Sequence, residues 1–218
     1  MLAALGFHVF DPCYSSNYGV AGCGDDFEGC RLEAFEGADH HDFIEIARAD
    51  SIEGHVVAGL AHAQELNPEG DWTYFIEGDQ PKWSRIIISG ISHGASTAGV
   101  IGLHRETRRV VMLSGPLDSG QAWLEAAPLT PIEAYFGFTA VDDDQHEGHL
   151  ASFETLGLVG APTSVDGAAP PYGGSHRLQS GAPGNGHVAT QAGGSSPIAD
   201  GGGYLYQPVW ETMYTSGL

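Results

Sequence analysis

The sequence predicts an α/β fold, a mostly parallel sheet flanked by helices, from three features that follow one another along the chain. An apolar, β-branched run at 86–88 is typical of a buried parallel strand. A G-x-S-x-G pentapeptide at 90–94 leads into small residues at 95–104, which can form a helix packed closely on a sheet. A second apolar run at 110–113 predicts the neighbouring strand.

The pentapeptide places Ser92 at a sharp turn between a strand and a helix. A serine in such a turn has a strained backbone, and only very small residues fit two positions before it and two after it. Gly90 and Gly94 meet this requirement. The Ser92 hydroxyl is then expected at the carboxyl edge of the sheet, where ligands bind in open α/β folds. The N–H of His93 would begin the helix and point at a developing oxyanion.

The composition excludes some classes of partner. The chain has 28 Asp and Glu against 8 Lys and Arg, a net charge of −20, so nucleic acid and anionic membrane surfaces are poor partners. No apolar run approaches the length of a membrane span. The 218 residues predict a single domain over 1–218. An acidic, lysine-poor surface fits a salt-adapted protein and an ordinary solvated surface equally well.

Three cysteines bear on the redox environment. Cys23 and Cys30 lie seven residues apart in a loop rich in glycine and aspartate, which a disulfide would staple. Such a bridge implies an oxidising compartment, so a secreted or periplasmic location is favoured. Three reduced cysteines in a cytosolic protein are the alternative. Zinc is not expected, because no second Cys or His pair lies nearby at ligand spacing.

The segments before and after the pentapeptide complete the predicted fold. The elements expected before it are a buried strand at 5–11, a loop at 12–30, a short extended segment at 31–35 and an amphipathic helix at 42–66. Those expected after 110–113 are a strand at 134–141, a helix at 146–156, short strands at 162–165 and 176–180, a long Gly/Ser-rich loop at 181–203 and a helix at 204–214.

Three aromatic residues follow predicted strands and are candidates to bind an acyl or aryl group: Tyr14, Tyr18 and Trp123. Packing in the core is the default role of each.

In the stretch from 83 to 118, which holds the pentapeptide, its helix and the two strands, the chain resembles the α/β-hydrolase superfamily. More narrowly, it resembles a group of poorly characterised bacterial serine hydrolases. The narrower resemblance rests on W-x-x-I-x-x-x-G-x-S-x-G-A at 83–95, V-V-M-x-S-G-P-x-D at 110–118, the pair Thr130-Pro131 and G-G-S-H-x-L at 173–178. It covers most of the chain from about Leu5 onward. It implies a Ser-His-Asp triad with Ser92 as nucleophile, in the chain order serine, acid, histidine.

The resemblance implies that the acid follows the strand at 134–141, as Asp142, Asp143 and Asp144 all do. The pattern F-T-x-x-x-D-x-Q-H of the group matches residues 138–146 and selects Asp143. Asp118 is the competitor, because it follows the preceding strand. The other role for the acidic run is a solvated cap on the helix that comes next.

His187 is the favoured base, and His176 is the alternative. His187 lies in the glycine-flanked segment G-N-G-H-V-A, whereas His176 lies within a predicted strand. A loop histidine can place its ring over the nucleophile, while a strand histidine is more often structural. Most of the other histidines that fall before or on helices are expected at the surface: those at 40, 41, 55, 62, 104, 146 and 149.

The expected chemistry is hydrolysis of a carboxylic ester through an acyl-enzyme, with no cofactor and no metal. The absence of an evident lid favours small or polymeric esters, and analogy with cutinase-like enzymes extends this to polyesters such as poly(ethylene terephthalate). Two other classes stay open. One is a non-catalytic binding protein on a hydrolase scaffold. The other is a metal-dependent protein that uses Asp142, Asp143, Asp144, His146 and His149.

The resemblance also implies a chain that lacks the first strands of the family. The strand expected at 5–11 resembles the fourth family strand, and no H-G-G-like loop, the usual source of the second oxyanion donor, precedes it. We therefore expect a sheet of about five or six strands whose open apolar edge favours a homo-oligomer. The second donor comes from the loop at 14–19 or is lost, which predicts weak esterase activity.

Overall fold

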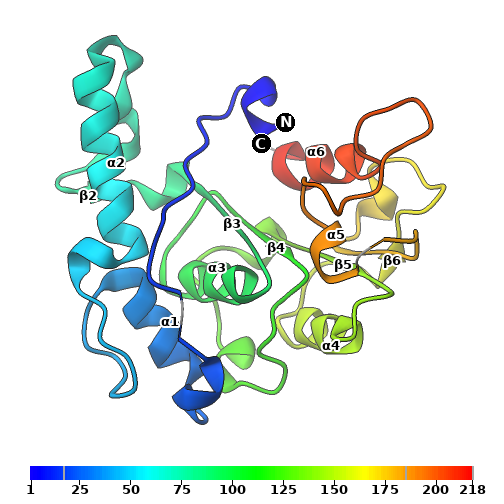
Figure 1. The fold of residues 1–218 in the computed structure, drawn as a ribbon, viewed down its shortest axis with the longest axis horizontal. Coiled ribbons are helices and arrows are strands. Elements are labelled where there is room, and N and C mark those ends of the chain that lie inside the picture. Colours follow the sequence, from blue (N-terminus) through cyan, green and yellow to red (C-terminus); the bar gives the residue numbers. More distant parts are fainter. Residues whose placement is uncertain (17, 185, 218) are drawn as a thin grey trace. The chain divides into compact units, whose positions relative to one another are not determined.

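The computed structural model describes residues 1–16, 18–184 and 186–217, which form two compact units at 1–86 and 87–218 (Figure 1). Asn17 and Asn185, in the loops expected at 12–30 and 181–203, lie outside the described residues. The single domain expected over 1–218 stays a prediction.

A parallel sheet organises the second unit, and it confirms the predicted α/β class. In the described part of this unit, five strands pair in the order β3-β4-β5-β7-β6. They are β3 (Ile87–Ile91), β4 (Arg109–Leu113), β5 (Tyr135–Ala140), β6 (Thr163–Ser164) and β7 (Arg177–Ser180). Ile91 pairs with Leu113 and Leu113 with Phe138, so β3, β4 and β5 end at the same edge of the sheet.

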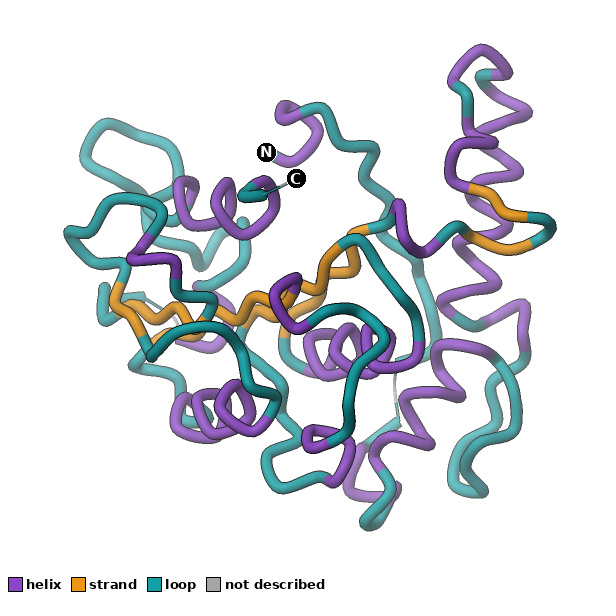
Figure 2. The backbone as a smooth tube through the Cα atoms, turned by 180° about the vertical axis from the view of Figure 1, so that it is seen from behind, coloured by secondary structure: helices purple, strands orange, loops and turns teal. Residues whose placement is uncertain are grey.

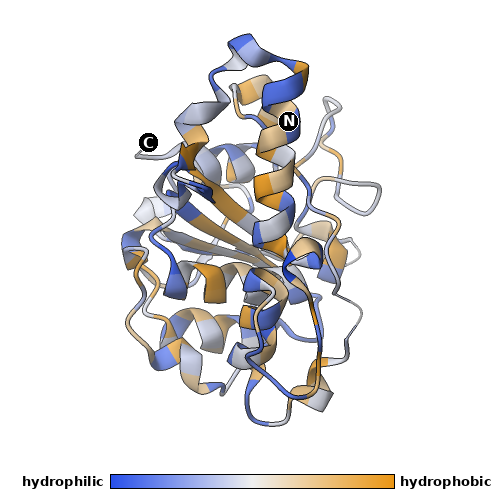
Figure 3. Ribbon diagram, turned by 90° about the vertical axis from the view of Figure 1, so that its left-hand side faces the viewer, coloured by the Kyte–Doolittle hydropathy of each residue, from blue (hydrophilic) through white to orange (hydrophobic). Residues whose placement is uncertain are grey.

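Helices cover both faces of this sheet. They are α3 (His93–His104), α4 (His146–Thr155), α5 (Gly186–Ala189) and α6 (Gln207–Thr215). Helices α3 and α4 lie on one face and α6 lies on the other (Figure 1 and Figure 2). Val110 and Met112 pack in the core between the sheet and α3, while the Arg109 guanidinium donates to the carbonyl of Met213 in α6 at 2.8 Å. Strands β4 and β5 are buried at every position, which explains their long hydrophobic stretches (Figure 3).

The first unit is mainly helical, and its helices correct two predictions. Its elements are α1 (Phe27–Glu36), α2 (Ile52–Leu66) and a hairpin of β1 (Ile76–Glu77) with β2 (Gln80–Pro81). The extended segment expected at 31–35 is wrong, and the helix expected from 42 begins only at Ile52. Capping decides both starts. The side chain of Asp26 accepts the N–H of Gly29 at 2.8 Å, and that of Ser51 accepts the N–H of Gly54 at 3.1 Å.

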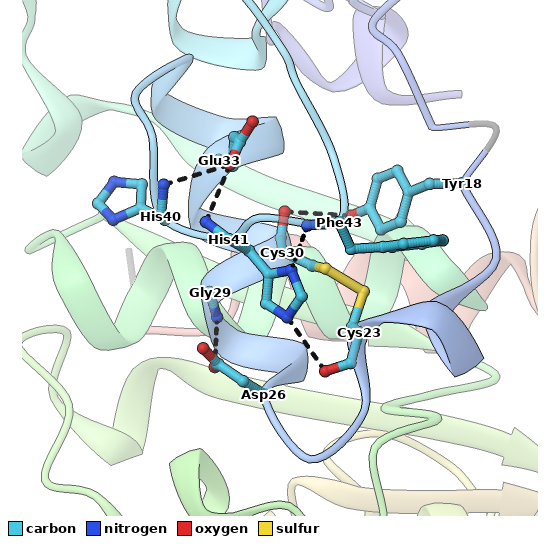
Figure 4. Close-up of a disulfide and its surroundings, with 9 residues drawn as sticks. All are labelled: Tyr18, Cys23, Asp26, Gly29, Cys30, Glu33, His40, His41 and Phe43. Atoms are coloured by element: carbon cyan, nitrogen blue, oxygen red, sulfur yellow. Dashed lines mark hydrogen bonds between the residues drawn. A yellow bond between two sulfur atoms is a disulfide. The ribbon is translucent and has the colours of Figure 1, made fainter.

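A disulfide joins Cys23 to Cys30, the pair favoured by the sequence (Figure 4). Both cysteines are buried, whereas Cys13 is an exposed free thiol. One turn further along α1, the buried Glu33 carboxylate accepts the N–H groups of His40 and His41 at 3.2 and 3.0 Å (Figure 4). The bridge and this carboxylate therefore fasten the segments before and after α1 to the helix. The compartment implied by the disulfide stays a prediction.

The strand expected at 5–11 is wrong. A short 3₁₀ helix occupies Leu2–Leu5, and the residues after it have no regular structure, with Val9 and Phe10 60% and 56% exposed. An apolar run becomes a strand only where a neighbour pairs with its backbone and a core receives its side chains. In the described part of the first unit, β1 and β2 pair only with each other. The run at 5–11 therefore has the apolar side chains of a strand, but no strand in the described part of this unit pairs with it.

Candidate active site

Ser92 joins β3 to α3 in a backbone conformation that residues with a side chain rarely adopt. Its φ is 57° and its ψ is −120°. The N–H of Ser92 donates to the carbonyl of Leu113 at 2.9 Å, and its own carbonyl accepts the N–H of Ala95 at 3.0 Å. The turn is thus held by β4 on one side and by α3 on the other. A conformation of this kind costs about 1–3 kcal/mol and persists only where the surrounding structure imposes it.

The two glycines of the pentapeptide have different surroundings. A Cβ atom at Gly90 would lie 2.2 Å from the carbonyl oxygen of Gly94, so β3 can approach the first turn of α3 only without a side chain there. A Cβ atom at Gly94 would meet nothing within 4 Å. The expectation that both positions exclude a side chain is therefore wrong for Gly94. The close approach is made by the Gly94 peptide group, and the space beside its Cα is open.

These surroundings predict unequal effects of two alanine substitutions. We expect Gly90→Ala to lower the free energy of unfolding by about 1–3 kcal/mol, because the backbone must move to admit the methyl group. Gly94→Ala should change it by less than about 0.5 kcal/mol. Urea unfolding of both variants beside the wild type measures the difference. Equal destabilisation by the two substitutions would contradict the close approach at Gly90.

Asp143 is the buried member of the three consecutive aspartates. It lies in the turn between β5 and α4 with its side chain 2% exposed, while Asp142 and Asp144 are exposed. One carboxylate oxygen, Oδ1, accepts the N–H of Gln145 at 3.0 Å. The other, Oδ2, lies 2.9 Å from Nδ1 of His187, as hydrogen-bond partners do. The structure therefore brings together the favoured acid and the favoured base.

His187 is carried by α5, whose backbone lies against the acid turn. A Cβ atom at Gly186 would lie 2.6 Å from the carbonyl carbon and oxygen of Asp142 and from the nitrogen of Asp143. Only glycine permits this approach, which sets the distance from His187 to Asp143. The imidazole itself is 31% exposed, so one side of the ring remains open to solvent.

A second set of contacts holds the end of α5. The hydroxyl of Thr190, just after the helix, lies 2.9 Å from the hydroxyl of Ser114, just after β4. The carbonyl of Thr190 accepts the indole N–H of Trp210 in α6 at 2.7 Å. All these groups are buried. The short helix that carries His187 is therefore fixed to the sheet and to α6 as well as to the acid turn.

The approach at Gly186 gives a testable prediction. We expect Gly186→Ala to push α5 away from Asp143 and to reduce kcat for an ester by about 10- to 100-fold, because misplacement by about 1 Å is enough for such a loss. Gly184→Ala is the matched control, since a Cβ there would have its nearest neighbour, Ala189 Cβ, at 3.5 Å. A Gly186→Ala variant with the kcat of the control would contradict this role of the glycine.

The alternative acid, Asp118, has a different partner. It is 1% exposed, and its Oδ2 accepts the indole N–H of Trp123 at 3.0 Å. Trp123 is buried as well, and a Cβ at Gly99 of α3 would lie 2.7 Å from its ring. Asp118 therefore anchors a core tryptophan, which agrees with the default packing role of Trp123, and the contact of Trp123 with substrate stays a prediction.

The alternative base, His176, lies at the other edge of the sheet. Its Nδ1 donates to the carbonyl of Tyr135 at 2.9 Å, at the amino end of β5, and its ring stacks on Phe136 with 3.7 Å between ring centres. Burial lowers the pKa of His176. Ser92 follows the carboxyl end of β3 in the same parallel sheet, so the structure does not bring His176 to the nucleophile.

Tyr14 and Tyr18 belong to the first unit. Tyr14 lines a pocket of about 400 Å³ together with Cys13 and His55. The Tyr18 hydroxyl donates to the carbonyl of Cys30 at 3.4 Å (Figure 4). Their contact with substrate, and the oxyanion donor expected from the loop at 14–19, stay predictions.

Two histidines of α4 are exceptions to the expectation that most of the helix histidines lie at the surface. His146 is 7% exposed and His149 is fully buried. His149 Nδ1 lies 2.9 Å from the hydroxyl oxygen of Thr139 and 3.8 Å from Oδ2 of Asp143. His146, His149 and the buried Phe153 are spaced at i, i+3 and i+7, so they lie on one face of α4. This spacing is the sequence signal that identifies the two histidines as part of the buried face of the helix.

No group of three or more His, Cys, Asp or Glu side chains within 1–16, 18–184 and 186–217 is arranged to hold a metal ion. In the same ranges, no helix combines the length and the apolar character required to cross a membrane. Comparison of the chain with known protein families, with curated proteins and with solved structures finds no match.

Proposed function

We propose that this protein is a serine hydrolase that cleaves carboxylic esters through a covalent acyl-enzyme. The observation that carries the proposal is the backbone of Ser92, with φ 57° and ψ −120° between a parallel strand and a helix. Strain of this kind gathers at functional sites, and this strand-turn-helix context is the one that a nucleophile elbow requires. The 2.9 Å contact between Asp143 and His187 supports it, in the chain order serine, acid, histidine.

In the proposed mechanism each group has one task. Asp143 accepts the hydrogen bond of His187 Nδ1–H, which leaves Nε2 to take the proton of Ser92 as its oxygen attacks the ester carbonyl. The N–H of His93, in the first turn of α3, donates to the oxyanion that develops on the carbonyl oxygen. His187 then returns the proton to the leaving alcohol. A water molecule, activated by the same imidazole, releases the acid from Ser92.

The Ser92 hydroxyl makes no hydrogen bond to any of the described residues. Contacts of a catalytic serine are often long in the free enzyme and tighten only when substrate is bound, so this state is compatible with the mechanism. Ser92 is half-buried and the His187 ring is 31% exposed. This access from solvent supports small esters and polymeric esters, polyesters included, as the substrate class.

Ester turnover and covalent labelling together test the proposal. We would assay a chromogenic short-chain ester and a polyester film, with and without a chelator, and treat the protein with a serine-reactive phosphonate. We expect hydrolysis that survives the chelator and stops with the phosphonate, and one adduct on Ser92 by peptide mass spectrometry. Turnover that the chelator abolishes would favour a metal-dependent enzyme. No turnover and no adduct would indicate a binding protein on a hydrolase scaffold.

A further inference from the structure

His149 is a buried polar side chain behind the acid that the proposed mechanism does not use. It lies on α4 with none of its surface exposed. Its Nδ1 edge faces the hydroxyl oxygen of Thr139 at 2.9 Å and Oδ2 of Asp143 at 3.8 Å. Its ring centre is 6.3 Å from that of His187, the other imidazole beside the same carboxylate. His149 therefore lies against Asp143 on the side away from solvent.

The surroundings of His149 identify the nitrogen that carries its proton. Its Nε2 is buried and has no hydrogen-bond partner among the described residues. A buried N–H without an acceptor is less favourable than a buried lone pair without a donor, so the proton belongs on Nδ1. The Nδ1–H group then donates to Thr139, whose own hydroxyl donates to Nδ1 of His146 at 3.3 Å. This order gives the Nδ1–H of His149 and the hydroxyl hydrogen of Thr139 one acceptor each.

The ring of His149 is neutral at the pH at which a serine hydrolase works. Burial lowers the pKa of His149 to about 4, the charge of Asp143 opposes this shift, and His187 and His146 add to it. A neutral ring with its proton on Nδ1 turns the positive end of an N–H dipole toward the Asp143 carboxylate. That carboxylate is 2% exposed and, among the described residues, has two hydrogen-bond partners, Gln145 and His187. A buried carboxylate with unused acceptor sites is stabilised by such a dipole.

We propose that His149 is a positioning residue of the triad, which fills the space behind Asp143 and holds its Oδ2 toward His187 by means of the Nδ1–H dipole. This inference rests on the proposed function, because the carboxylate needs an exact orientation only if His187 acts as a base. His149 does not touch the substrate, so its effect should fall on kcat and leave KM unchanged.

Three substitutions at this position separate the dipole from the volume of the ring. His149→Leu removes the dipole and should reduce kcat about 10- to 100-fold with KM within about twofold, as expected for a shift of about 1 Å in a catalytic group. The amide nitrogen of His149→Asn falls near the position of Nδ1 and should restore most of the lost kcat. The amide nitrogen of His149→Gln falls near Nε2 and should not. Ser152→Ala, a buried change on the same helix, is the control and should keep wild-type kcat.

A double-substitution cycle tests whether His149 acts through the acid. In the Asp143→Asn background, His149→Leu should add less than about a twofold loss, because residues that act as a unit are not additive. The inference would be overturned if the double variant lost as much kcat as the product of the two single losses, or if a folded His149→Leu variant kept wild-type kcat. In either case, a phosphonate adduct on Ser92 would still support the proposed function. If His149→Leu does not fold, the Asn and Gln variants decide, and equal kcat for the two would overturn it. A wild-type protein without turnover or adduct would overturn both.

Discussion

Ester hydrolysis is expected to fall by at least about 10⁴-fold when Ser92 is replaced by alanine, because the substitution removes the proposed nucleophile. The Ser92 hydroxyl makes no hydrogen bond to the described residues, so its loss should leave the fold and the melting temperature almost unchanged. Single-turnover and steady-state assays with the chromogenic ester measure the first effect, and thermal unfolding measures the second.

A second substitution at the same position tests the backbone strain. Glycine adopts positive φ readily, so Ser92→Gly should be as inactive as Ser92→Ala but more stable than it by about 1–2 kcal/mol. Alanine retains the Cβ atom and therefore the strain, which makes it the matched reference. A Ser92→Gly variant less stable than Ser92→Ala would show that the turn is relaxed in solution. Substantial hydrolysis by either folded variant would rule out Ser92 as the nucleophile.

His187→Ala should be nearly as damaging, with a loss of about 10⁴-fold or more in kcat, because the members of a triad act as a unit. Its ring is 31% exposed, so the substitution should change the free energy of unfolding by less than about 1 kcal/mol.

His176→Ala provides the control with the opposite pattern. This ring bonds to the carbonyl of Tyr135 and stacks on Phe136 at the far edge of the sheet. We expect its removal to lower the free energy of unfolding by about 1–3 kcal/mol and to leave kcat within a few-fold of the wild type. The same ester assay and urea unfolding serve for both variants. A larger loss of kcat in His176→Ala than in His187→Ala would mean that the base has been misidentified.

The local sequence pattern was sufficient for β3, β4 and α3 of the second unit, but it missed α5 (Gly186–Ala189), which lies in the segment expected to be a loop at 181–203. The runs at 86–88 and 110–113 are apolar at consecutive positions, as is typical of parallel strands, and the second of them is buried at every position. The structure accordingly has β3 at Ile87–Ile91 and β4 at Arg109–Leu113, with α3 between them. In each case the sequence pattern and the burial in the sheet favour the same structure.

Local pattern failed in the first unit because competing signals were present. The helix α1 is set by a cap at Asp26 and by Gly37, whose φ of 66° ends it, inside a stretch that lacks an apolar periodicity. The apolar run at 5–11 carries a strand pattern but has no pairing partner among the described residues of its unit. Capping can be recognised from sequence, whereas the presence of a partner strand cannot.

By itself, the sequence determined the α/β class, the position of Ser92 at a strand-helix turn, and short sets of candidate acids and bases, because these depend on residue order and on which strand each residue follows. Only the tertiary structure showed how the candidates lie: Asp143 is the aspartate that contacts His187, Asp118 bonds to Trp123, and His176 lies at the amino edge of the sheet. Helix packing likewise buried His149 behind the acid, and the path of the chain left room at Gly94 but none at Gly90. Each of these outcomes is a distance between groups far apart in the chain, and such distances are set by how the elements pack.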